Sequence, residues 1–337
     1  MAGLLPTTAH QNHIMRFPKF IILSFLFLIF GSAYSQDYSA VDTKVKSYPI
    51  FAKPELLANK INADFNTEDD KARAIFTWIA SNIKYDMVEY MGTGGVKQVA
   101  FTYRTPEEKA RKVKQFNMEI VSKTWRTRKA ICHGYAELFN HLAELTGLES
   151  KMIPGTSKSH PTQIGKFPSV ADHAWNAVKT NGKWHLIDAT WAAGGVDGAT
   201  NKFFEKFNDS YFFTDPEIFF LNHFPEDDKN LMSNKTREEF AALPLYYGDY
   251  LESDFTIEAP NKGIITAKSA NVPFRFKNLS ADRISYVLSN NNVFKGVIPV
   301  RNGDISEFDI FLDKNFSGYL TIFVDGSSVV SYKIQRG

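Results

Sequence analysis

The chain has 337 residues, with 39 Lys and Arg against 37 Asp and Glu, so its formal charge is +2. Its 29 Phe, 14 Tyr and 5 Trp carry too much apolar area for most of the length to be disordered. Cys132 is the single cysteine, which excludes a disulfide scaffold and a zinc site built on several thiolates. The length is typical of about two domains.

The N-terminal segment has the pattern of a secretory signal peptide. An apolar run at residues 20–30 follows Arg16 and Lys19 and ends in small residues, with an expected cleavage after Ser35. A membrane-spanning helix would need about 20 apolar residues, more than this run contains. We therefore expect an exported protein, periplasmic or extracellular, without stable membrane insertion once residues 1–35 are removed.

Met1 and Met15 are both acceptable starts for this segment. Removal of residues 1–35 takes away two basic residues and no acid, which leaves 37 basic and 37 acidic residues. This balance favours neither nucleic acid nor an anionic membrane as a partner.

Helical periodicity dominates the first half of the mature chain, and strand periodicity follows it. The segments expected in chain order are an extended lead-in at 36–53, a short helix at 54–65, a helix at 68–84 capped by Thr67, a loop at 87–104, a helix after Thr105, a helix at 132–145 that ends at Gly147, and strands at 149–153, 172–179 and 183–190. Asn181-Gly182 is expected as the two-residue turn of a hairpin.

From about residue 250 short alternating runs are separated by Gly, Asn, Asp and Ser, which predicts a small antiparallel β-sandwich. The expected organisation is a signal peptide at 1–35, a first domain at 36–246 and the sandwich at 247–337.

Cys132 is a candidate nucleophile. It lies at the expected start of a helix, where free N–H groups and the helix dipole stabilise a thiolate. Arg126, Arg128 and Lys129 add positive charge just upstream. A buried structural cysteine is the alternative, and the helix position alone does not decide between them.

The predicted hairpin supplies a base for this thiol. If Asn181 and Gly182 form the turn, paired residue numbers sum to 363, and His173 and Asp188 become diagonal neighbours on one face. His185 then lies on the opposite face. A carboxylate that holds one imidazole nitrogen leaves the other free to accept a thiol proton. Each residue alone fits a structural role better, but together they favour a Cys-His-Asp triad.

No metal or cofactor is expected. The other histidines lack a His-Glu-x-x-His pattern, and the glycines at 92–95 lack the lysine and hydroxyl of a phosphate-binding loop.

Three motifs together resemble the transglutaminase-like superfamily of papain-related cysteine enzymes. They are Arg128-Lys-Ala-Ile-Cys-His-Gly-Tyr-Ala136, His173-Ala-Trp-Asn-Ala-Val178 and Trp184-His-Leu-Ile-Asp-Ala-Thr-Trp191. Residues 211–217 and 223–227 are similar to the kyphoscoliosis peptidase and cytokinesis-protein branch in particular. The resemblance covers about residues 65–245.

This resemblance implies an α+β catalytic domain of transglutaminase/papain type, with helices packed on an antiparallel sheet, followed by an immunoglobulin-like β-sandwich. It implies Cys132 as nucleophile, His173 as base and Asp188 as the group that orients the base. Backbone N–H groups at the helix start, with the indole of Trp125, are the expected donors to an oxyanion.

The function we expect is that of an exported peptidase, amidase or acyl transferase. It would act on amide bonds of peptide, protein or cell-wall peptide substrates through a thioester. The alternative is a catalytically silent scaffold of the same fold, with the sandwich as its partner surface. The substrate, the choice between hydrolysis and transamidation and the oligomeric state are not predicted.

Overall fold

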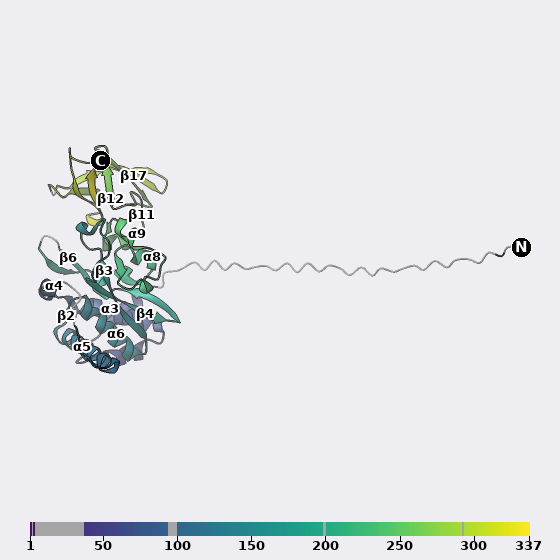
Figure 1. The fold of residues 1–337 in the computed structure, drawn as a ribbon, viewed down its shortest axis with the longest axis vertical. Coiled ribbons are helices and arrows are strands. Elements are labelled where there is room, and N and C mark those ends of the chain that lie inside the picture. The colour runs from purple at the N-terminus through teal and green to yellow at the C-terminus, as the bar shows by residue number, and fades with distance from the viewer. Residues whose placement is uncertain (2, 4–36, 94–99, 198–199, 292) are drawn as a thin grey trace. The chain divides into compact units, whose positions relative to one another are not determined.

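The computed structural model describes residues 1, 3, 37–93, 100–197, 200–291 and 293–337. The predicted signal segment, apart from Met1 and Gly3, lies outside these residues, as does part of the predicted loop at 87–104. Tyr38–Gly337 forms one compact unit (Figure 1). Within the described chain, no helix has the length and apolar character that crossing a bilayer requires.

In the part of the chain that the structure describes, six helices precede the main sheet. They are α1 (Ser39–Lys46), α2 (Pro54–Asp64), α3 (Glu68–Asn82), α4 (Met87–Thr93), α5 (Pro106–Thr127) and α6 (Cys132–Thr146). The predicted starts of α3 and α5 are confirmed, since the hydroxyls of Thr67 and Thr105 accept the N–H groups of Asp70 and Glu108. Gly147 ends α6 with a φ of +82°, as its position predicts.

Two predictions in this region are wrong. Residues 36–53, expected to be extended, contain α1, and the loop expected at 87–104 begins with α4. Among the residues that the structure describes, no side chain caps α1. It is held by α3 instead, because Arg73 forms a bidentate ion pair with Asp42, at 2.8 and 2.6 Å, and Thr77 donates to the same carboxylate. Such support comes from tertiary packing and leaves no local signal.

An antiparallel sheet covers α6 and carries the candidate site. Its order is β8 (Phe212–Thr214), β5 (Lys183–Ile187), β4 (His173–Thr180), β3 (Glu149–Ser157) and β9 (His223–Pro225). Helix α6 packs against β3 and β4, and all three are labelled in Figure 1. The hairpin register is confirmed, since Thr180 pairs with Lys183 and Asn176 with Ile187.

Short elements connect this sheet to its surroundings. Strand β1 (Lys84–Tyr85), which follows α3, pairs in parallel with β2 (Lys129–Ala130), which comes just before α6. The others are η1 (Pro161–Gln163), α7 (Ala189–Ala192), β6 (Gly194–Asp197), β7 (Lys202–Glu205), η2 (Asp209–Tyr211), α8 (Pro216–Phe219), η3 (Asp228–Asn230), α9 (Arg237–Ala242) and α10 (Gly248–Leu251).

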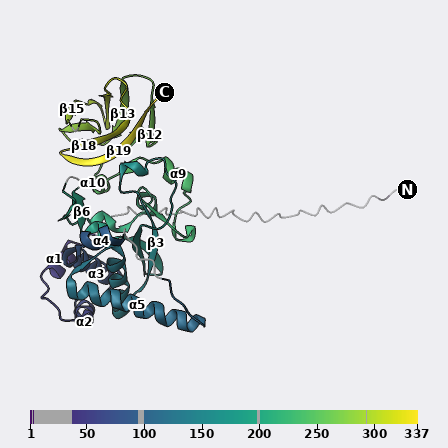
Figure 2. The same ribbon diagram turned by 60° about the vertical axis from the view of Figure 1, so that its left-hand side comes forward.

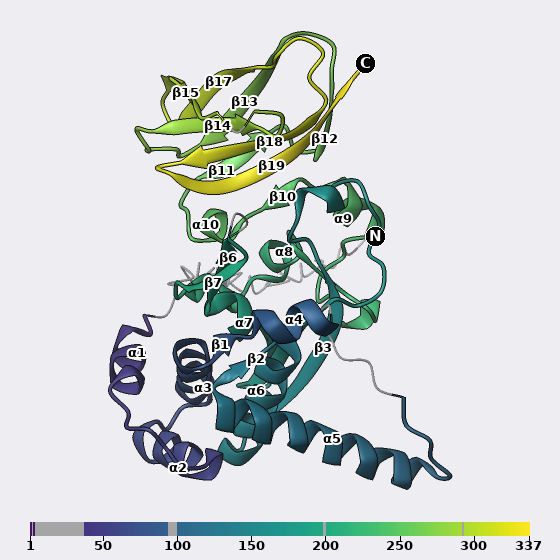
Figure 3. The ribbon, with the colours of Figure 1, turned by 90° about the vertical axis from the view of Figure 1, so that its left-hand side faces the viewer.

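Two sheets form the C-terminal β-sandwich (Figures 2 and 3). One contains β10 (Leu245–Tyr246), β19 (Ser327–Arg336), β18 (Gly318–Val324), β14 (Ile284–Leu288) and β15 (Lys295–Val297), with β12 (Ile264–Ala267) also paired to β19. The other contains β11 (Thr256–Ala259), β13 (Asn271–Lys277), β17 (Ile305–Phe311) and β16 (Val300–Asn302). Alternate residues point inward, such as Phe274 and Phe276 on β13.

The helices packed on an antiparallel sheet, followed by a β-sandwich, confirm the predicted fold class. The first hydrophobic core lies between the helices and the main sheet, and the second lies between the two sheets of the sandwich.

Candidate active site

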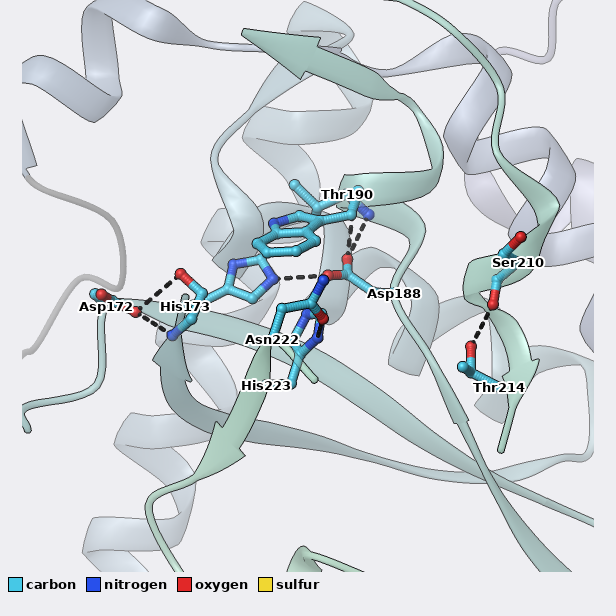
Figure 4. Close-up of polar contacts among 10 residues, drawn as sticks. Asp172, His173, Asp188, Thr190, Ser210, Thr214, Asn222 and His223 are labelled. Atoms are coloured by element: carbon cyan, nitrogen blue, oxygen red, sulfur yellow. Dashed lines mark hydrogen bonds and ion pairs between the residues drawn. The ribbon is translucent and has the colours of Figure 1, made fainter. Parts of the chain in front are cut away.

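Asp188 lies at the centre of the site (Figure 4). It follows the last residue of β5 and is the N-cap of α7, a position that suits Asp. Its Oδ1 accepts the backbone N–H groups of Thr190, at 2.8 Å, and Trp191, at 3.1 Å. The side chain is completely buried, so these donors replace the water that a carboxylate would otherwise bind.

His173 begins β4, the strand next to β5. Its Nε2 lies 2.7 Å from Oδ2 of Asp188, and its Nδ1 is therefore the nitrogen left for another partner. Burial alone would lower the pKa of His173, but the charge and hydrogen bond of Asp188, together with Cys132, outweigh burial and raise it. The diagonal contact expected from the hairpin register is present in the structure.

Cys132 is the first residue of α6 and is 1% exposed. It packs with Ala136 of the same helix, Ala174 of β4 and Met152 of β3. It lies close enough to His173 to act on the pKa of that imidazole. The structure therefore brings Cys132, His173 and Asp188 together from α6, β4 and the end of β5.

Trp125, expected beside the oxyanion, is engaged elsewhere. Its indole N–H donates to the carbonyl of Ala52 at 3.1 Å. Its ring stacks on Trp78, with centroids 4.9 Å apart, and the guanidinium of Arg128 lies 4.0 Å from its centroid. An indole N–H that already has an acceptor cannot serve an oxyanion without giving that bond up, so the structure does not support this expectation.

His223 also belongs to the site, although no local pattern in the sequence indicates this. Its Nε2 lies 3.0 Å from the same Oδ2 of Asp188 that binds His173. The side chain is buried, and its ring stacks on Phe219 with centroids 4.0 Å apart. The resemblance of residues 223–227 to a known branch was a signal for this segment, but nothing local linked His223 to Asp188.

Strand β3 explains how two distant histidines reach one carboxylate. Gly155 pairs with His173 on one side and with Pro225 on the other, so His223, two residues before Pro225, lies on the same face as His173. A Cβ on Gly155 would lie 2.3 Å from the ring of Trp175, which crosses this strand. The missing side chain therefore makes room for the ring of Trp175, which lies against both histidines.

One carboxylate and two imidazoles are also side chains that can bind a metal ion. Among the described residues, His173, Asp188 and His223 are the group whose ligand atoms all lie within 4.8 Å of one another. The two distances from ring nitrogen to carboxylate oxygen, 2.7 and 3.0 Å, are those of hydrogen bonds. Hydrogen bonds from the two imidazoles to the carboxylate of Asp188 therefore explain why the three side chains lie close together.

Two neighbouring polar residues lie outside the site. Asp172 points away from the imidazole of His173 and accepts the N–H of Ser157 at 2.7 Å (Figure 4). His185 stacks on Phe213, with centroids 4.2 Å apart. His185 therefore serves as a control histidine in the experiments below.

Known proteins match this chain in sequence. Residues 55–189 match the profile of the transglutaminase-like superfamily. Kyphoscoliosis peptidase of Homo sapiens is 27% identical over 325 residues, which is 90% of this chain and 46% of that protein. Kyphoscoliosis peptidase of Mus musculus is 28% identical over 298 residues, or 87% and 41%. Hillarin of Drosophila melanogaster is 32% identical over 124 residues, or 33% and 15%. The chain spans less than half the length of the kyphoscoliosis peptidases that it matches.

Proposed function

For a chain that carries a domain of the transglutaminase-like superfamily and is similar to kyphoscoliosis peptidase over most of its length, we propose a cysteine-dependent enzyme that acts on amide bonds of peptide or protein substrates. One observation carries the proposal. A thiol at the first position of a helix lies beside an imidazole whose other nitrogen is held at 2.7 Å by a buried carboxylate.

The chemistry follows from these positions. His173 takes the proton of Cys132 on Nδ1, and the thiolate attacks the carbonyl carbon of the amide. The imidazolium that forms is stabilised by Asp188, which keeps Nε2–H directed at Oδ2. His173 then gives its proton to the leaving amine, and a thioester to Cys132 remains. Water completes a hydrolysis, or an amine completes an acyl transfer.

The developing oxyanion needs donors near the thiol. Backbone N–H groups in the first turn of α6 are the candidates, because no side chain among the described residues caps this helix start. Trp125 is not needed in this scheme.

A second candidate function is a catalytically silent scaffold that binds its partner through the β-sandwich. The observation that favours it is the burial of Cys132, which exposes 1% of its surface. A substrate carbonyl can reach such a thiol only if neighbouring side chains move.

Labelling of Cys132 with iodoacetamide across pH separates the two functions and needs no knowledge of the substrate. If the site is catalytic, the wild-type thiol is labelled rapidly at mildly acidic pH, and His173→Ala removes that reactivity, because the thiolate is the nucleophile and needs the base. His185→Ala should label like the wild type. A thiol that stays unlabelled in the folded protein at mildly acidic pH supports the scaffold.

We also propose that the protein is exported. The support is the apolar run at residues 20–30 with its basic start and its small residues before Gln36. Protein isolated from its native host should begin at or near Gln36. Recovery of intact residues 1–35 on protein from the cytoplasm would contradict this.

A further inference from the structure

One oxygen atom in the site serves two histidines. Oδ2 of Asp188 lies 2.7 Å from Nε2 of His173 and 3.0 Å from Nε2 of His223, while Oδ1 accepts two backbone N–H groups. The proton transfer described above uses only His173. His223 is buried to the same degree as Asp188, so its place on this carboxylate needs its own explanation.

The protons on His223 follow from its partners. The imidazoles of His173 and His223 hold the pKa of Asp188 well below its usual range despite burial, and an ionised carboxylate can only accept hydrogen bonds. Nε2 of His223 must therefore carry a hydrogen and donate it. Burial lowers the pKa of His223 to about 4, although Asp188 acts in the opposite direction, so the ring is neutral at physiological pH.

A neutral His223 with its hydrogen on Nε2 needs a donor at Nδ1. Oδ1 of Asn222 lies 2.7 Å from Nδ1, and turning this amide by half a turn, which its shape allows equally well, brings its NH2 group to the ring as the donor. Stacking on Phe219 and the pairing of His223 with Ser157 fix the ring in place. His223 is thus a rigid, neutral N–H donor aimed at Asp188.

We propose that His223 is a positioning residue that divides the charge of Asp188 between two imidazoles and so limits the proton affinity of His173. This inference rests on the proposed function. A carboxylate with a single imidazole partner would hold the imidazolium of His173 more tightly. A base that binds its proton too strongly is a poor acid for the leaving amine, since general acid–base catalysis is best when proton affinity matches the working pH. The N–H of His223 draws part of the negative charge away from His173 and also prevents rotation of the carboxylate.

Two substitutions test this in the full chain. His223→Phe keeps a ring of similar size and removes the N–H, whereas His223→Gln places an amide N–H near the position of Nε2. His185→Phe is the matched control, because His185 stacks on Phe213 away from the site. The rate of Cys132 labelling by iodoacetamide is measured against pH, and the high-pH limb reports loss of the proton from His173.

In His223→Phe we expect this limb to move to higher pH, which corresponds to a gain of about tenfold in the proton affinity of His173, the scale of a hydrogen bond to a charged group. His223→Gln should keep the limb near that of the wild type, and His185→Phe should not move it. A limb that stays in place or moves to lower pH in folded His223→Phe overturns the proposal. A change in wild-type labelling on addition of EDTA also overturns it, because the three side chains would then hold a metal ion.

Ring nitrogen NMR of the wild-type protein keeps the test independent of folding of the variants and of catalysis. We expect one histidine to stay neutral with its hydrogen on Nε2 between pH 5 and 8, and His223→Gln should remove that signal. Titration of His223 in this range overturns the inference. If Cys132 resists labelling at every pH, the proposed enzyme fails, while the NMR result still decides the role of His223.

Discussion

At the scale of single residues, Asp188 has two roles in the structure. It caps α7 through Oδ1 and binds two imidazoles through Oδ2. Asp188→Asn keeps the shape but removes the charge, and an amide cannot accept from all of these donors. We expect labelling of Cys132 at neutral pH to fall by about 10³-fold or more, since the analogous change in a serine triad has a larger effect still.

Cys132→Ala should abolish any amide-cleaving activity, and His173→Ala should cost nearly as much, because nucleophile and base act as a unit. Melting temperature is measured beside the labelling rate for each variant. If folded Asp188→Asn labels at the wild-type rate, the carboxylate only supports the fold and the triad is not catalytic.

Glu137 provides a prediction on stability. It lies on α6, is 6% exposed, and burial raises its pKa to about 7. Because the unfolded pKa is about 4.3, the folded state binds more protons than the unfolded state between these values, so folding stability falls as pH rises from about 4 to 7.

Glu137→Gln removes this penalty. We expect a melting temperature above that of the wild type at pH 8 and equal to it at pH 4, measured by circular dichroism. The reverse order, with Glu137→Gln less stable at pH 8, would show that the carboxylate is ionised and favourably paired in the fold.

At the scale of elements, β3 shapes the site because Gly155 has no side chain, which leaves space for the ring of Trp175. Gly155→Ala would place a methyl group 2.3 Å from the ring of Trp175 and 2.4 Å from the carbonyl oxygen of Phe224. We expect a loss of about 1–3 kcal/mol in the free energy of unfolding, typical of overpacking, together with slower labelling of Cys132, because Trp175 lies against both histidines.

Gly296 of β15 is the control, since a Cβ there meets nothing closer than 4.0 Å. Gly296→Ala should leave stability and labelling close to those of the wild type. Equal effects of the two substitutions would mean that the close approach at Gly155 is unimportant.

At the scale of the whole molecule, the β-sandwich has its own hydrophobic core and includes β10, which precedes the expected boundary at residue 247. Leu245 pairs with Ser331 of β19, and the buried Tyr246 stacks on Tyr250 with centroids 4.7 Å apart.

A fragment that begins at Pro244 should fold alone with a β-type circular dichroism spectrum and a cooperative melt. A fragment that begins at Gly248 lacks β10 and should melt at a lower temperature. A fragment from Pro244 that is insoluble or melts without cooperativity would show that the sandwich depends on the rest of the chain.

Local patterns predict what depends on near neighbours in the sequence. The caps at Thr67 and Thr105, the stop at Gly147 and the hairpin register all follow from interactions within a few residues or across a two-residue turn. The contact of His173 with Asp188 was predictable for the same reason, because one hairpin joins them.

Contacts between segments that are far apart in the chain could not be predicted from such patterns and are visible only in the tertiary structure. The motifs in the chain predicted the fold class and the hairpin contact of His173 with Asp188, and the resemblance to a known superfamily predicted that Cys132 lies beside them. Only the tertiary structure decided that α1 forms on α3, that Trp125 donates to Ala52, and that His223 shares Asp188 with His173. The physical reason is the same in each case. These partners are 31, 73 and 35 residues apart, and their contact is produced by packing of whole elements, which leaves no periodic or spacing signal in the chain.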